Sequence, residues 1–170
     1  MTTLAAAGSK LVDTAKVANR RLLHFDSIDQ MLQEVDRLVA AERAGRLVQL
    51  GNWTLGQVLG HLATWSEFSY TGVPLKPPFF IRWIVRFQKN KFLYKPMPSG
   101  VKIPGIEGGT LGIKPATLEE GLARFKSICQ RLKTEAPTAP SPIFGRMTHD
   151  ESIALSLRHA ELHLGFFVPQ

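Results

Sequence analysis

The sequence predicts an all-α protein built as a four-helix bundle, with a long crossover insert between the second and third helices. A helix-start signal recurs four times, each copy precedes apolar residues at three- and four-residue steps, and no segment shows the alternation of a β-strand. The signal is a Ser or Thr followed three residues later by Glu or Gln, as in a capping box. The four pairs are Ser27 with Gln30, Thr54 with Gln57, Thr117 with Glu120 and Thr148 with Glu151.

The four predicted helices span residues 27–44, 54–70, 117–133 and 148–166. The first has a clear amphipathic period, because Ile28, Met31, Leu32, Val35, Leu38 and Val39 fall on one face. In the third, Cys129 follows Phe125 by four residues, and we interpret it as a small core residue. We expect the four apolar faces to share one core.

A chain of 170 residues is long enough for one domain with a substantial core. We expect a flexible N-terminal arm over residues 1–22 and a single helical domain over residues 23–170, with the insert at about 71–116. Within the insert, Pro77 and Pro78 can start a short apolar helix over residues 79–87. Residues 97–114 are rich in Gly and Pro, so we expect them to be irregular.

The insert also holds the protein's excess positive charge. The net charge is +7, and the insert has eight basic residues against Glu107 alone: Lys76, Arg82, Arg86, Lys89, Lys91, Lys95, Lys102 and Lys114. Such a basic, aromatic-rich segment can contact nucleic acid, an anionic membrane surface or an acidic ligand. It can also be a hydrophobic flap or dimer contact with solvated lysines at its rim. We favour the flap, because no nucleic-acid motif is present.

The composition places few limits on the cellular compartment. No apolar run approaches the roughly 18 residues that span a bilayer. The first eight residues, MTTLAAAG, are too short for a signal-peptide core and follow no basic residues, although they resemble the tail of a longer export signal. The single cysteine excludes an internal disulfide. We expect a cytoplasmic protein, and export stays the alternative.

Three histidines are the candidate functional residues. On a helical wheel of about 100° per residue, His159 and His163 share one stripe of the last predicted helix, flanked by apolar residues. Arg158 and Glu161 fall on the side that we expect to face solvent. On the second predicted helix, His61 shares a stripe with two aromatic residues, Trp65 and Phe68. All three imidazoles are therefore expected to point inward, where an unpaired polar ring is costly.

Two imidazoles four residues apart can bind one metal ion from a single helix, and a third from a neighbouring helix completes a ligand face. We expect a divalent metal, zinc, nickel or iron, at His61, His159 and His163. Three neutral ligands leave coordination positions open, whereas a structural zinc site normally has four protein ligands. The alternative is that each histidine is a satisfied core or surface residue. His24 and His149 are assigned no role, and His149 is expected to be solvated.

Two segments, NWTLGQVLGHLATWSEFSYTG at residues 52–72 and PIFGRMTHDESIALSLRHAELHLGFF at 142–167, resemble the DinB-like superfamily. More narrowly they resemble its domain-of-unknown-function 1569 branch, over roughly residues 20–167. The resemblance implies a four-helix bundle with a long crossover, a metal triad at His61, His159 and His163, and frequent homodimers. Its relatives include metal-dependent transferases that use low-molecular-weight thiols. The branch commonly has a histidine where this chain has Ser141.

The leading hypothesis is an enzyme in which the metal activates a water or a thiolate for attack on a small electrophile, anionic or thiol-bearing. No general base is assigned, because Glu161 and Glu67 are expected to face away from the site. The alternative is a binding protein whose metal is structural or vestigial and whose insert contacts a partner or an anionic membrane surface. A third hypothesis is a homodimer that stores a small ligand.

Overall fold

The computed structural model describes residues 11–73, 86–101, 110, 114–142 and 144–170, and it is mostly helical. The elements in chain order are α1 (Ile28–Arg43), β1 (Leu47–Gln49), α2 (Leu55–Thr71), α4 (Lys89–Tyr94), α5 (Leu118–Thr134), α6 (His149–Leu164) and β2 (Phe167–Pro169). The prediction of an all-α class is confirmed. Within the described residues, no helix is both long enough and apolar enough to cross a bilayer.

Each long helix begins directly after its predicted cap. The hydroxyls of Thr54, Thr117 and Thr148 each accept a hydrogen bond from the amide three residues later, and a reciprocal side-chain bond completes a capping box. Ser27 caps α1 in the same way, but Gln30 accepts a bond from the amide of Asp26 and not from that of the cap. The four predicted starts are therefore right, because the capping signal is local in sequence.

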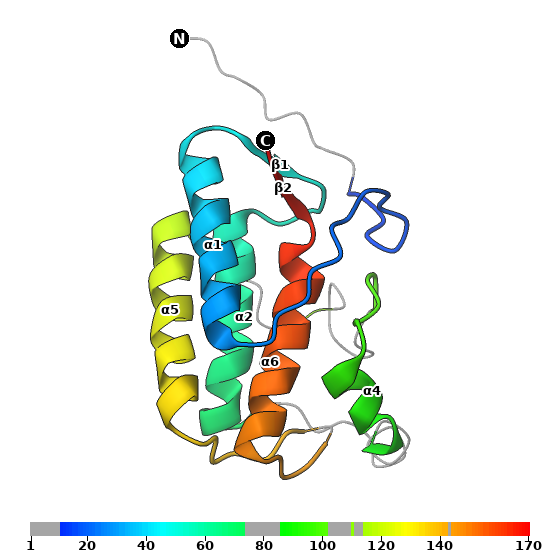
Figure 1. Cartoon of the computed structure of the whole chain (residues 1–170), viewed down its shortest axis with the longest axis vertical. Helices are drawn as coiled ribbons and strands as arrows, with labels where there is room; N and C mark the ends of the chain where they lie inside the picture. Colours follow the sequence, from blue (N-terminus) through cyan, green and yellow to red (C-terminus); the bar gives the residue numbers. More distant parts are fainter. Residues whose placement is uncertain (1–10, 74–85, 102–109, 111–113, 143) are drawn as a thin grey trace.

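The four long helices lie side by side and share one hydrophobic core (Figure 1). Each contributes fully or nearly fully buried side chains, among them Val35, Leu38, Leu59, Ala63, Phe125, Leu132, Leu157 and Leu164. Cys129 is buried in this core, as predicted. The helices α2 and α5 approach especially closely. A Cβ placed on Gly56 would lie 2.6 Å from the carbonyl carbon of Thr117, and one on Gly121 would overlap the carbonyl oxygen of Gly56.

A two-stranded antiparallel sheet, which the sequence did not predict, closes one end of the helices. Val48 of β1 pairs with Val168 of β2. Three-residue strands are too short to show an alternating pattern, and their pairing joins residues over a hundred positions apart. Phe167 is almost fully buried as the first residue of β2. The helix α6 ends at Leu164 and not at the predicted Phe166.

The described part of the insert packs against α6 through the short helix α4, which the sequence did not predict (Figure 1). Leu93 is buried, the ring of Phe92 lies 5.5 Å from that of Phe144, and Lys89 Nζ lies 2.6 Å from a carboxylate oxygen of Glu151. The helix expected over residues 79–87 lies outside the described residues except at its end. Of the segment expected to be irregular, residues 97–101, 110 and 114 are in neither helix nor strand.

Candidate metal centre

The three predicted histidines come together between α2 and α6. His159 Nε2 lies 3.2 Å from His61 Nε2 and 3.0 Å from His163 Nε2. One ring nitrogen from each residue lies within 4.8 Å of those of the other two. His159 and His163 are one helical turn apart, so the same face of α6 presents both, and His61 meets them from the middle of α2.

These spacings suit a shared cation. Metal–nitrogen bonds of about 2.0–2.1 Å place neighbouring ligand nitrogens about 3.3 Å apart in a tetrahedral site and about 2.9 Å apart in an octahedral one. The observed separations of 3.2 and 3.0 Å match that range. Hydrogen bonding alone explains them less well, because His159 Nε2 carries either one hydrogen or one lone pair and faces two partners. The arrangement therefore fits a metal-binding site.

Two tryptophans form the surroundings of the imidazoles. The ring of Trp53 stacks on His163 at 5.5 Å and lies 5.4 Å from His61. Trp65 stands edge-on to His61 at 6.2 Å and to His159 at 5.9 Å. The sequence placed Trp65 on the stripe of His61 without giving it a role, and it missed Trp53. The position of Trp53, directly before the cap of α2, is the only local signal that could have suggested it.

Burial favours the neutral form of two of the three imidazoles, His159 and His163. His61 is only 1% exposed. Burial, with a smaller contribution from the neighbouring His61, lowers the pKa of His159 to about 3. Burial also lowers the pKa of His163 well below its usual range, with smaller contributions from His159, His61 and the Arg20 guanidinium. Only a neutral imidazole has a lone pair to give to a metal, so at neutral pH His159 and His163 are in the form that binds one.

The N-terminal arm covers the part of α6 that was expected to face solvent. Arg158 and Glu161 are only 7% and 6% exposed, so the predicted solvent exposure is wrong for both. Residues 11–26, which we call the N-terminal arm from here on, cross α6 (Figure 1). Arg158 donates to the Phe25 carbonyl oxygen, the Glu161 carboxylate accepts from the Phe25 amide, and the two side chains form an ion pair. The helical wheel could not predict this cover, because the arm has no hydrophobic period.

The arm also holds the end of α6 that presents the ligands. Arg20 Nη1 donates to the carbonyl oxygen of Leu162 at 3.1 Å, and the Arg21 amide donates to that of Gly165 at 2.9 Å. The Arg21 guanidinium then bridges the Glu34 carboxylate in α1, at 2.7 Å, and the Phe167 carbonyl oxygen in β2, at 2.9 Å. The arm therefore fixes α6 relative to α1 over the turns that carry His159 and His163.

The other two histidines lie outside the triad, and neither was assigned to it. His24 Nδ1 lies 3.0 Å from Arg158 Nη1, which makes it the acceptor of that guanidinium. His149 Nε2 lies 2.6 Å from the carbonyl oxygen of Leu132 in α5. His149 is half-buried, so the prediction that it is solvated is wrong. Its contact with α5 could not be seen from its own helix.

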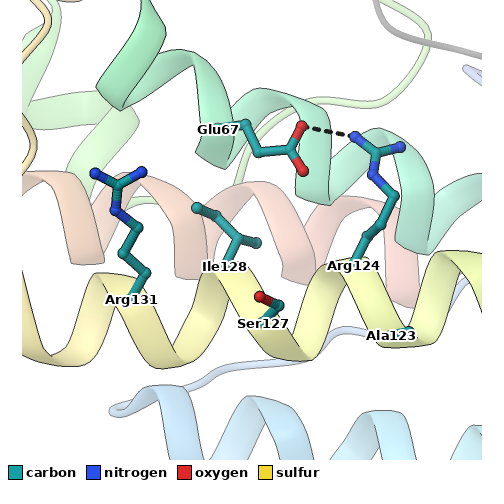
Figure 2. Close-up of a pocket in the computed structure, with 6 residues that line it drawn as sticks. All are labelled: Glu67, Ala123, Arg124, Ser127, Ile128 and Arg131. Carbon is teal, nitrogen blue, oxygen red and sulfur yellow. Dashed lines mark hydrogen bonds and ion pairs between the residues drawn. The ribbon is translucent and has the colours of Figure 1, made fainter.

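Glu67 faces a different part of the molecule from the triad. It lines an open groove of about 420 Å³ between α2 and α5, where it forms an ion pair of 2.6 Å with Arg124 (Figure 2). The groove is otherwise lined by Ala123, Ser127, Ile128 and Arg131, and none of the three histidines borders it. Glu67 therefore points away from the imidazoles, in agreement with the sequence.

Comparison with known proteins gives one match. The family model described as "Protein of unknown function (DUF1569)" matches residues 17–170, which is most of the chain. No curated protein and no solved structure matches. The match begins within the arm that covers α6, and it includes all three histidines of the candidate metal centre. The chain belongs to the DUF1569 family.

Proposed function

We propose that this protein is a DinB-like, divalent-metal-binding protein that acts as a metal-dependent transferase or hydrolase on a small molecule. The observation that carries the proposal is the convergence of the ring nitrogens of His61, His159 and His163. Three neutral nitrogens on one side of an ion leave its other positions open. This ligand set suits zinc, nickel or iron, all of which imidazole binds well.

Different residues of the chain would bind the ion, hold its ligands in place and attract the substrate. His61, His159 and His163 hold the ion, and the N-terminal arm and Trp53 keep His163 in place. When bound, such an ion lowers the pKa of a water or thiol ligand and so supplies a nucleophile near neutral pH. Arg20 adds positive charge next to His163, which favours an anionic or thiolate-bearing substrate.

We assign no general base. The Glu161 carboxylate is held by the Phe25 amide and by Arg158. The Glu67 carboxylate is held by Arg124 on the far face of α2. Glu161 and Glu67 are thus both committed to other partners. This observation also favours the second candidate function, a non-catalytic binding protein in which the metal is structural or vestigial.

The proposed architecture is a DinB-like four-helix bundle with its crossover between α2 and α5. Four capped helices that share one core and the long connection before α5 support it. The sequence resemblance also leads us to propose a homodimer formed by helix packing. Light scattering coupled to size-exclusion chromatography tests the dimer, and a mass of one chain would contradict it.

The metal content of the protein tests the proposal. The protein should be produced without a nickel-affinity tag, and its metal measured by mass spectrometry. We expect about one divalent ion per chain in the wild type, lost in His159→Ala and His163→Ala. His149→Ala is the matched control, because His149 lies on the same helix outside the triad, and it should keep the metal. A wild type that stays metal-free and gains no thermal stability from added zinc, nickel or iron would overturn the proposal.

Activity separates the two candidate functions. An enzyme should transfer or hydrolyse a small electrophile in the presence of a low-molecular-weight thiol or water, and the metal-free His159→Ala variant should lose that activity. A metal-loaded protein with no activity beyond that of the His159→Ala variant, across a panel of such electrophiles, would favour the non-catalytic function.

A further inference from the structure

We propose that the outward face of α4 and the exposed residues at its two ends bind the surface of a membrane that contains anionic lipids. The α4 patch consists of Lys91 and Tyr94 in the helix, Arg86 and Phe87 before it and Lys95 directly after it, and all five are exposed. It lies apart from the three histidines in sequence, and the inference does not depend on whether they bind a metal. Three features of the patch support this proposal: the sidedness of α4, the exposure of Phe87 and Tyr94, and basic side chains that form no ion pair with a described residue.

The helix α4 has one face fixed to the protein and one face turned outward. Leu93 is buried, and Phe92 packs on Phe144. Lys91 and Tyr94 are three residues apart, so they share the opposite side of the helix, and both are exposed. Lys95, which follows the last helical residue, is exposed as well. In Figure 1, α4 stands outside the group of four long helices, with α6 between it and α1. The patch is therefore presented on a projecting element.

The two aromatic rings of the α4 patch are largely exposed. Phe87 is 75% exposed and Tyr94 is 63% exposed. A phenylalanine has no polar group to satisfy in water, whereas at a membrane interface its ring can leave water among the headgroups and acyl chains. Tyrosine is enriched at such interfaces, because its ring is apolar and its hydroxyl stays hydrated.

Every charged residue in the segment that contains these rings is basic. Residues 86–101 contain four basic residues and no acidic one. Lys89 is neutralised by Glu151, while Arg86, Lys91 and Lys95 form no ion pair with any described residue. Each lysine or arginine near an anionic membrane strengthens binding by about fivefold. The patch therefore has the charge complementary to an anionic lipid surface.

The shape of the patch favours a membrane over nucleic acid. Proteins that bind single strands stack bases along a basic groove, and duplex readers place a long helix or a β-ribbon in the major groove. The α4 patch instead combines the outer side of a six-residue helix with exposed residues at its two ends. A projecting aromatic and basic face suits a broad, deformable surface of negative headgroups, which leads us to choose the lipid surface as its partner.

Co-sedimentation with vesicles tests the inference on the full-length protein. Vesicles of phosphatidylcholine with about one third phosphatidylserine should bind the protein, and vesicles of phosphatidylcholine alone should not. Raising the salt from about 0.1 M to about 0.5 M should weaken binding, because the Debye length falls from about 10 Å to about 4 Å. The variant Phe87→Ser with Tyr94→Ser should bind less at both salt concentrations, since it loses apolar contact and no charge.

A charge-matched pair of variants locates the binding surface. Lys91→Glu with Lys95→Glu should weaken vesicle binding by at least about tenfold, given about fivefold for each positive charge removed. Lys16→Glu with Arg46→Glu changes the net charge equally at exposed positions outside α4 and should retain most of the binding. All four side chains are exposed, so both variants should fold, which circular dichroism and thermal unfolding can confirm.

Three results would overturn the inference. The first is that wild-type protein does not bind phosphatidylserine vesicles at low salt. The second is an equal loss of binding in the two charge-reversed variants, which would mean that net charge alone drives it. The third is tighter binding to a DNA or RNA oligonucleotide than to vesicles, lost in Lys91→Glu with Lys95→Glu, which would make the patch a nucleic-acid surface.

Discussion

Replacing Arg158 by methionine should destabilise the protein by about 3–5 kcal/mol, the usual cost of leaving one member of a buried ion pair without its partner. Arg158 and Glu161 are both buried under the N-terminal arm. The substitution removes the donor to the Phe25 carbonyl oxygen and leaves the Glu161 carboxylate with the Phe25 amide and with His24 Nδ1, 3.5 Å away, but without its guanidinium. Burial already raises the pKa of Glu161, so an uncompensated carboxylate at this position is unfavourable.

A second substitution should reverse part of that loss. Adding Glu161→Gln to Arg158→Met removes the unpaired charge, while the amide oxygen can still accept from Phe25 N. The remaining cost is one weakened set of neutral hydrogen bonds, about 1–3 kcal/mol. The double variant should therefore be more stable than Arg158→Met by about 2 kcal/mol. Glu161→Gln alone, by contrast, should be destabilising, because it leaves the Arg158 guanidinium without its carboxylate.

Urea unfolding followed by circular dichroism measures these differences. The experiment should be run at one fixed pH for the wild type and all three variants. A total stability of about 5–15 kcal/mol, typical of single domains, leaves room to measure all three variants. If the costs of the two single variants simply add in the double variant, then Arg158 and Glu161 are not paired in solution and the reasoning is wrong.

Three further predictions concern the core and the arm. The Arg37 and Arg21 hydrogen bonds outweigh the effect of burial and lower the pKa of Glu34. The stabilising contribution of Glu34 is therefore present above about pH 4.5 and is lost as the pH falls through the lowered folded-state pKa. Glu34→Gln should remove this pH dependence of the unfolding free energy, and an unchanged pH profile would contradict the prediction. Burial raises the pKa of Cys129 to about 12, so a thiol reagent at neutral pH should modify it only after urea unfolding, and prompt modification of the folded protein would contradict its burial. Gly121→Ala should lower the free energy of unfolding by about 1–3 kcal/mol, because the added Cβ would separate α2 from α5. Gly60→Ala should have no such effect, because its added Cβ would make only an ordinary contact at 3.5 Å. Equal effects of the two variants in thermal unfolding would contradict the close approach of the helices.

Much of the fold was predictable because its signals are local. The caps at Thr54, Thr117 and Thr148 depend on residues three positions apart, and the structure begins a helix after each. The strands β1 and β2 were not predictable in this way. Each has three residues and gains its partner only when the end of the chain returns to the loop after α1. The helix α4 is similarly short, and its inner face is defined by α6.

The candidate metal centre also has features that local sequence predicts and features that depend on how the chain packs. The inward direction of His159 and His163 follows from their spacing on α6, and the stripe of His61 follows from α2. The sequence could not show that α2 and α6 bring these rings within 3.2 Å, because that depends on how the helices pack. It also could not show that the arm covers Arg158 and Glu161, since hydrogen bonds to the backbone of Phe25 leave no pattern in the sequence.

Diffraction data collected at a metal absorption edge test the central claim most directly. Crystals of protein produced without a nickel-affinity tag should be measured at the zinc, nickel and iron edges. We expect one anomalous peak between the imidazoles of His61, His159 and His163, about 2.0–2.2 Å from each ligand nitrogen. Density that shows three hydrogen-bonded imidazoles with no anomalous peak among them, even after soaking with each metal, would contradict a metal centre at this position.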